Sequence, residues 1–137
     1  MKTRLAMTLG AALAAFALQA APSAAASPRY ADMVLSDQKG GAAKHVFKPD
    51  TAKIYLHAKL EDVPGGSTVK SDWIAEKTQV APPNYKMDSV ELKIGPLINN
   101  VDFNMSKPTK GWPPGDYRID LFINDKPAGN VKYKIDK

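Results

Sequence analysis

The sequence predicts an all-β protein in which two antiparallel sheets pack face to face as a sandwich. About seven segments of the chain alternate apolar and polar residues with a period of two, which is typical of strands with one buried face. The 11 prolines and 9 glycines separate these segments by frequent turns. No segment shows the helical period convincingly. Because each strand has one apolar and one polar face, each sheet is expected to bury one side and expose the other.

The first 26 residues are set apart from this pattern. They open with Lys2 and Arg4, an apolar run follows, and a tract of small residues ends at Ala26. This order is typical of a secretory signal peptide. We predict cleavage after Ala26, with Ala20 as the alternative, and a periplasmic or secreted protein. The apolar run is too short for a membrane span, so none is expected after cleavage, and without a cysteine at its end we expect no lipoprotein anchor.

The remaining chain is weakly basic and contains no cysteine. The full sequence has a formal net charge of +5, and removal of the two basic residues in the signal segment leaves +3. Charge of this size, spread along a chain, is weak support for a polyanionic partner. No basic stripe with interleaved aromatic residues is present, so no nucleic-acid partner is predicted. In an oxidising compartment, a fold without disulfides depends on its hydrophobic core.

The strands are expected in the following order. Residues 27–46 form a frayed start, a weak strand around Met33 and Leu35, and a flexible loop containing Gly40 and Gly41. Residues 47–137 form the sandwich domain. Its predicted inward-facing positions are Ile54, Leu56, Ala58 and Leu60; Val69, Ser71, Trp73 and Ala75; Val90, Leu92 and Ile94; Val101, Phe103 and Met105; Tyr117, Ile119, Leu121 and Ile123; and Val131, Tyr133 and Ile135. The last two strands are joined by a hairpin turn at 124–129.

A resemblance to a known family rests on the end of the chain. The stretch WPPGDYRIDLFINDKPAGNVKYKI at 112–135 looks like the final hairpin of bacterial extracytoplasmic immunoglobulin-like domains, and 47–62 is similar to their opening strand. The resemblance implies an immunoglobulin-like β-sandwich. It also implies structural roles for Trp73, for Gly115 in closing a turn, and for Tyr117 as a corner tyrosine that hydrogen-bonds back to the main chain. The paired cysteines of antibody domains are absent.

Catalytic and metal-binding patterns are weak. The two histidines, His45 and His57, are not accompanied by a nucleophile elbow, and no pair of carboxylates is marked as buried together. We therefore predict a protein that is not an enzyme and has no cofactor. A copper-binding or metal-chaperone protein of the periplasm is the alternative, in which His45 and His57 act with methionines.

Five residues are candidates for a binding surface. Trp112 and Pro113 lie in a loop stiffened by prolines, and Tyr85 lies in a turn. Ile74 and Phe122 interrupt the polar faces of their strands and would form an exposed apolar patch. For Trp112 the favoured interpretation is a lid over the open end of the core, with an exposed contact as the competing one. For Ile74 and Phe122 the alternative is cover by the N-terminal segment. The preferred hypothesis is a non-enzymatic binding or structural module of the bacterial cell envelope, with another envelope protein or a glycan as its partner.

Overall fold

Residues 27–137 of the computed structural model are described, and they form eight β-strands and no helix. The strands are β1 (Arg29–Ser36), β2 (Val46–Phe47), β3 (Lys53–Glu61), β4 (Thr68–Thr78), β5 (Tyr85–Lys93), β6 (Asn100–Ser106), β7 (Gly115–Ile123) and β8 (Lys126–Ile135). Within this part of the chain no helix is long and apolar enough to cross a membrane. The predicted signal peptide, residues 1–26, lies outside the described residues.

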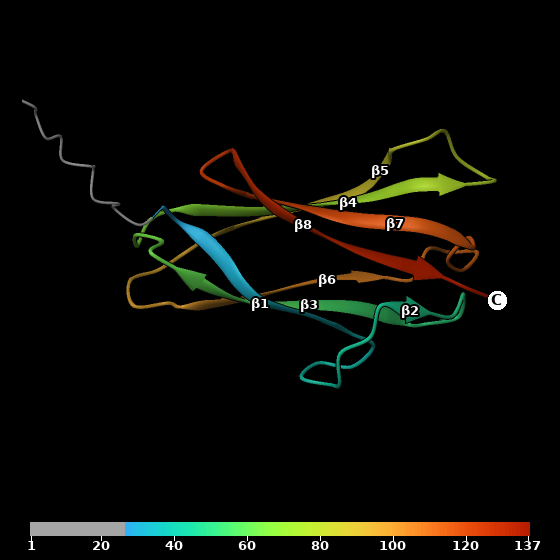
Figure 1. Ribbon diagram of the computed structural model, residues 1–137, viewed down its shortest axis with the longest axis horizontal. Helices are drawn as coiled ribbons and strands as arrows, with labels where there is room; N and C mark the ends of the chain where they lie inside the picture. The colour runs from blue at the N-terminus through green and yellow to red at the C-terminus, as the bar shows by residue number, and fades with distance from the viewer. Residues whose placement is uncertain (1–26) are drawn as a thin grey trace, which may run out of the picture.

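The strands form two sheets that lie over one another as two layers (Figure 1). One sheet has the order β1-β3-β6 and the other β2-β8-β7-β4-β5. Neighbouring strands are antiparallel in every pair except β2 and β8, which are parallel. The predicted sandwich is therefore confirmed, with the two-residue strand β2 added to the strands expected from the sequence.

The core lies between the two sheets and consists of the inward-facing side chains of the alternating segments. Trp73, Tyr117 and Phe103 are among its largest fully buried members. Ser71, a polar residue on the inward face of β4, is buried and accepts a hydrogen bond from Nε1 of Trp73 at 3.1 Å. This contact satisfies the indole donor, which would otherwise be buried without a partner.

The N-terminal segment belongs to the sandwich more fully than expected. β1 begins at Arg29, which we had placed in a frayed start, and pairs with β3 along its length. Tyr30 and Leu35 are both buried in the core, although side chains five residues apart on a regular strand point to opposite faces. A bulge between Ala31 and Val34 shifts the register and places both side chains inward. Strand β1 is therefore an edge strand of the three-stranded sheet.

Strand β5 differs most from its predicted pattern. It begins at Tyr85, which we had placed in a turn, and most of its residues are exposed. Leu92, predicted to face inward, is 37% exposed, while Ile94 beyond the strand end is buried. The reason is position: β5 is the edge strand of its sheet, and the sheet opposite ends at β6, so one face of β5 is only partly covered.

The hairpin between β7 and β8 is tighter than expected. We predicted a turn over 124–129, but β8 already begins at Lys126. Asn124 and Asp125 both have positive φ, 50° and 67°. Positive φ at both central residues of a two-residue turn matches the twist of the flanking strands, and asparagine and aspartate tolerate it better than most residues.

Candidate binding site at one end of the sandwich

The loop between β6 and β7 plugs the end of the core. Trp112 is only 1% exposed, so the expected lid on the core is confirmed and the competing exposed contact is wrong. Its backbone N–H donates to Pro49 O at 2.9 Å, and its Nε1 donates to Thr51 O at 2.8 Å. The ring also meets Tyr117 and Tyr133 edge-on. A large ring at the open end of a sandwich is more stable in the core than in water, provided that its N–H finds a partner.

The start of β7 holds this loop in place. The Tyr117 side chain is fully buried, and its hydroxyl donates to Pro113 O, four residues upstream, at 2.5 Å. Burial also raises the pKa of Tyr117 to about 12. Gly115 has φ of 151°, and a Cβ at this position would collide with the backbone oxygen of Lys77. The close approach of β4 to the start of β7 therefore requires glycine.

An apolar cleft of about 540 Å³ opens beside this loop, between the end of the five-stranded sheet and the β6–β7 connection. Tyr85 and Pro113, two of the residues singled out in the sequence, lie together in its lining. Val80, which we had not singled out, joins them and is 73% exposed, while Tyr85 is 51% exposed. The full lining is Ala75, Thr78, Val80, Ala81, Pro82, Tyr85, Met87, Pro108, Thr109, Lys110, Gly111, Pro113 and Tyr117. We call it the apolar cleft.

A second hollow of about 640 Å³ adjoins the apolar cleft and shares Thr78, Val80 and Pro113 with it. Its charged lining residues are Lys77, Lys134 and Lys137 with Asp116 and Asp136. We call it the charged hollow. The two recesses therefore place an apolar surface and a lysine-containing surface side by side, with Thr78, Val80 and Pro113 as the wall between them.

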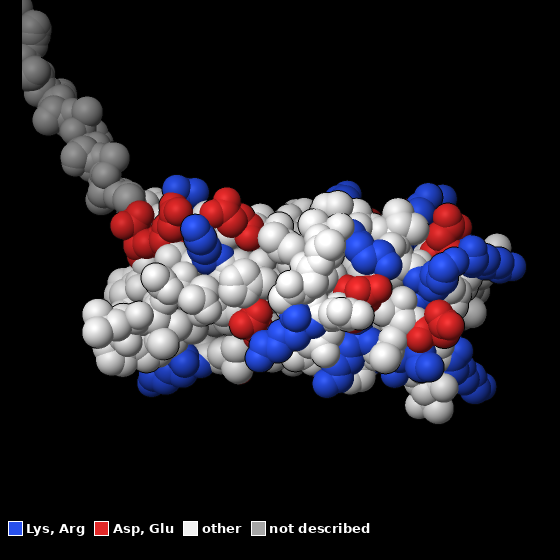
Figure 2. Space-filling model, turned by 90° about the horizontal axis from the view of Figure 1, so that it is seen from below, with Lys and Arg blue, Asp and Glu red and all other residues white. Residues whose placement is uncertain are grey.

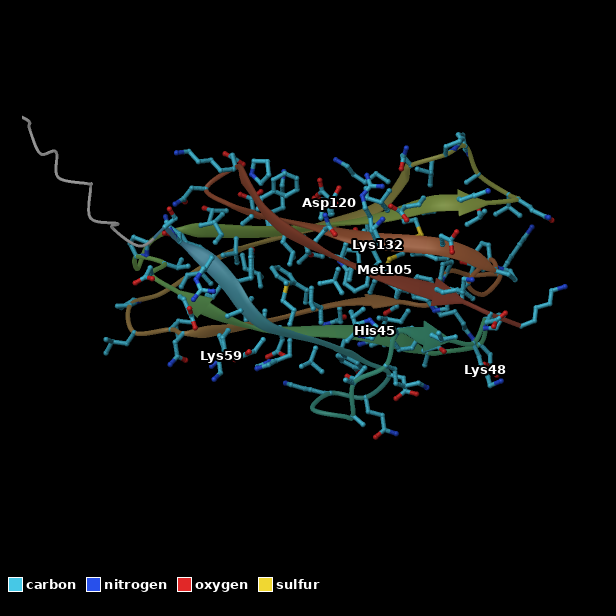
Figure 3. All side chains as sticks on the ribbon, in the orientation of Figure 1. His45, Lys48, Lys59, Met105, Asp120 and Lys132 are labelled. Carbon is cyan, nitrogen blue, oxygen red and sulfur yellow. The ribbon has the colours of Figure 1, made fainter. Side chains whose placement is uncertain are left out.

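The surroundings of both recesses are strongly basic. The strand ends and loops at this end of the molecule, residues 48–53, 77–86, 107–116 and 134–137, contain eight lysines and three aspartates. The other described residues contain nine basic and eleven acidic residues. Figure 2 shows basic side chains gathered at the right-hand end, and Figure 3 places Lys48 there, with Lys59 nearer the opposite end. The sequence did not reveal this end because its lysines come from four separate segments.

Ile74 and Phe122 lie on the outer face of the five-stranded sheet and do not line the apolar cleft. Ile74 is 5% exposed, so its predicted exposure is wrong; in the sheet it lies between Lys86 and Arg118, whose long side chains flank it. Phe122 is half-buried, with Nζ of Lys70 at 4.6 Å from its ring centroid. These two residues therefore do not form the apolar patch that the sequence suggested.

The outer face of the same sheet carries a network of ion pairs. Arg118 contacts Asp120 at 2.9 Å and Glu76 at 3.1 Å, and it also donates to Oδ1 of Asn84 at 2.7 Å. The hydrogen bond that Arg118 donates to Asp120 is the main reason that the pKa of Arg118 is raised. The network links β4 and β7 to the loop before β5, close to the apolar cleft.

The two histidines are not brought together. His57 Nδ1 lies 2.8 Å from Oδ1 of Asp102 on the three-stranded sheet. His45 Nδ1 lies 3.3 Å from the backbone oxygen of Lys132 on β8, in the other sheet (Figure 3). Over residues 27–137 no group of three or more histidine, cysteine, aspartate or glutamate side chains is placed to hold a metal ion. Met33, Met87 and Met105 are partly buried against the core.

Two solved structures are similar in fold to this protein. An immunoglobulin-like protein from Pseudomonas aeruginosa is similar, with a TM-score of 0.56 and 13% sequence identity, over 83% of this chain and 100% of that chain. The alkylpurine DNA glycosylase AlkC from Pseudomonas fluorescens, bound to DNA containing an abasic-site analogue, has a TM-score of 0.49 at 13% identity, over 80% of this chain and 30% of that chain. No protein-family model matches the sequence, and no curated protein matches it.

The protein is therefore an immunoglobulin-like β-sandwich. The resemblance inferred from the final hairpin is confirmed at the level of the fold, including a buried Trp73 in β4 and a Tyr117 that bonds back to the main chain.

Proposed function

We propose that this protein is a non-enzymatic binding module, exported to the bacterial cell envelope, that docks another envelope protein at the apolar cleft. One observation carries the proposal. Tyr85 and Val80 remain exposed beside a recess of about 540 Å³, in a protein whose other large aromatic residues are mostly buried. An apolar recess with exposed aromatic and aliphatic side chains is the usual anchor point of a protein interface.

The lining of the cleft favours a protein over a glycan. It contains three prolines with Tyr85 and Met87, and its polar side chains are two threonines and Lys110. Sugar recognition needs several precisely placed hydrogen-bonding groups, whereas the apolar side chains of a protein partner need little more than a shaped apolar surface. None of the lining side chains is a histidine or a carboxylate, which are the commonest general acids and bases. The cleft is thus suited to binding rather than to bond cleavage.

A comparison of two exposed sites tests the proposal. The double variant Val80→Ser/Tyr85→Ser removes apolar surface from the cleft, and Leu97→Ser removes a fully exposed leucine from the β5–β6 loop. Both proteins should unfold at the wild-type temperature, because the substituted side chains contribute little to the core. Each protein would be cross-linked in isolated envelopes and the bound proteins quantified by mass spectrometry. We expect the double variant to lose its partner and Leu97→Ser to retain it. Capture of the same partners by all three proteins would show that the apolar cleft is not the docking site.

Export is tested separately. The full-length chain would be expressed in a bacterium and the envelope and cytoplasmic fractions separated. We expect the protein in the envelope fraction, with Ser27 as the first residue by N-terminal sequencing. An uncleaved protein retained in the cytoplasm would contradict the envelope location.

A further inference from the structure

We infer that the segment recognised at this end is an acidic, extended stretch of a partner polypeptide that carries one bulky apolar anchor residue. This inference rests on the proposed function and adds the chemistry of the partner. It follows from the arrangement of the apolar cleft beside the charged hollow and from the concentration of lysines around both.

The apolar cleft provides the anchor site. Its floor reaches Ala75 and Tyr117, which are buried on the inner face of the five-stranded sheet, and its rim is formed by Val80, Tyr85 and Pro113. A side chain can enter such a recess and lose contact with water on several sides. Prolines and tyrosines lose little conformational entropy when a ligand binds, so this lining is well suited to hold a leucine or an aromatic side chain.

The charged hollow receives the acidic part of the segment. Val80, Thr78 and Pro113 line both recesses, so a chain that leaves the apolar cleft over this wall meets Lys77, Lys134 and Lys137 directly. Asp116 and Asp136 lie in the same hollow and lower its net positive charge. A single compact anion would meet these aspartates as well as the lysines, so the hollow favours several carboxylates carried along an extended chain.

The charge of the whole end acts at longer range. Eight lysines against three aspartates attract an acidic segment and orient it before contact, while the other described residues carry a small acidic excess. A flat anionic bilayer would also be attracted by these lysines. It would not enter the recess at Tyr117, however, because a bilayer surface contacts only groups that protrude.

Binding of synthetic peptides to the mature protein tests the inference. The probe is a short fluorescent peptide of glutamates with a single central leucine, and the reference probe is an oligoglutamate of equal length. We expect the leucine peptide to bind at least about tenfold more tightly than oligoglutamate, and its affinity to fall with rising salt. Lys77→Glu/Lys137→Glu should weaken binding of the leucine peptide by about tenfold or more. Val80→Ser/Tyr85→Ser should reduce its affinity to that of oligoglutamate.

A matched control and two contrary outcomes complete the test. Lys93→Glu/Lys126→Glu makes the same change in net charge at exposed positions of the opposite end and should leave binding nearly unchanged. Equal affinity for both peptides would show a general polyanion surface and overturn the inference. Adsorption to phosphatidylglycerol vesicles without peptide binding would overturn it in favour of a membrane surface. If Val80→Ser/Tyr85→Ser loses its envelope partner but no peptide binds, this inference fails while the proposed function stands.

Discussion

Two stacked tyrosines in the core differ in one hydrogen bond. The rings of Tyr117 and Tyr133 are nearly parallel, with centroids 5.1 Å apart. The Tyr117 hydroxyl donates to Pro113 O, whereas the buried Tyr133 hydroxyl has no hydrogen-bond partner among the described residues. A buried polar group without a partner is destabilising, so the two hydroxyls are expected to contribute to stability with opposite sign.

Removal of each hydroxyl tests this difference. Tyr117→Phe should lower the free energy of unfolding by about 1 kcal/mol or more, because it leaves the Pro113 carbonyl without its donor. Tyr133→Phe should be neutral or stabilising, because it removes the unpartnered group and keeps the ring contacts. Urea denaturation of the two variants measures both values. Equal losses would show that the Tyr133 hydroxyl has a partner in solution, such as a buried water.

At the scale of elements, the β6–β7 loop has two roles. One side of it places the Trp112 ring in the core and hydrogen-bonds to the β2–β3 connection through Pro49 and Thr51. Its other side forms part of the apolar cleft through Pro108 and Pro113. The shape of the cleft therefore depends on the packing of a tryptophan that does not line it.

Substitution of Trp112 tests whether this residue supports both the stability of the core and the shape of the apolar cleft. Trp112→Ala should lower the free energy of unfolding by about 3–5 kcal/mol, as expected for deletion of a buried aromatic side chain. It should also weaken binding of the leucine peptide at temperatures where the variant is still folded. Trp112→Phe keeps most of the ring but loses the bond to Thr51, so it should cost less stability and retain binding. A Trp112→Ala protein with the wild-type free energy of unfolding would contradict the role of Trp112 in closing the end of the core.

At the scale of the whole molecule, the buried tyrosines link folding to alkaline pH. Burial raises the pKa of Tyr117 to about 12, and burial also raises the pKa of Tyr30 and of Tyr133. In the unfolded chain each tyrosine has a pKa of about 10. Above that pH the folded protein holds more protons than the unfolded chain, so stability decreases as pH rises.

The expected pH dependence can be measured directly. The urea midpoint should be constant with respect to these groups below about pH 10 and should fall between about pH 10 and 12. Tyrosinate absorbance should develop together with the loss of β-structure in the circular dichroism spectrum. Tyr117→Phe serves as the comparison, because it lacks one of the three groups and should show a shallower decline over this interval. Full ionisation of these tyrosines without unfolding would show that they do not link folding to alkaline pH.

Much of the fold was predictable because the signals are local. Alternation within a strand depends only on the period of the strand, so the inward positions of β3, β4, β6 and β7 were assigned correctly. The pattern was less informative at β1 and β5. A bulge changes the phase of β1 along its length, and β5 lies at a sheet edge where one face is only partly covered.

The candidate site was less predictable, because it depends on contacts between distant segments. Tyr85 and Pro113 were recognised as loop residues, but their common cleft requires the β4–β5 and β6–β7 connections to meet. The sequence left Trp112 open between a lid on the core and a surface contact, and only the fold places its Nε1 against the backbone oxygen of Thr51. Ile74 looked exposed, yet it is buried at a position between Lys86 and Arg118 of the neighbouring strands. Burial of a side chain depends on these neighbours, which a one-dimensional pattern does not contain.

The amino-acid sequence by itself determined the all-β class, most of the strands and the corner tyrosine, because hydrophobic period and turn residues act over a few positions. Only the tertiary structure decided that eight lysines gather at one end, beside an apolar recess. Eight lysines in four segments have no visible relation along the chain, and they become one surface because strands of both sheets end on the same side of the sandwich.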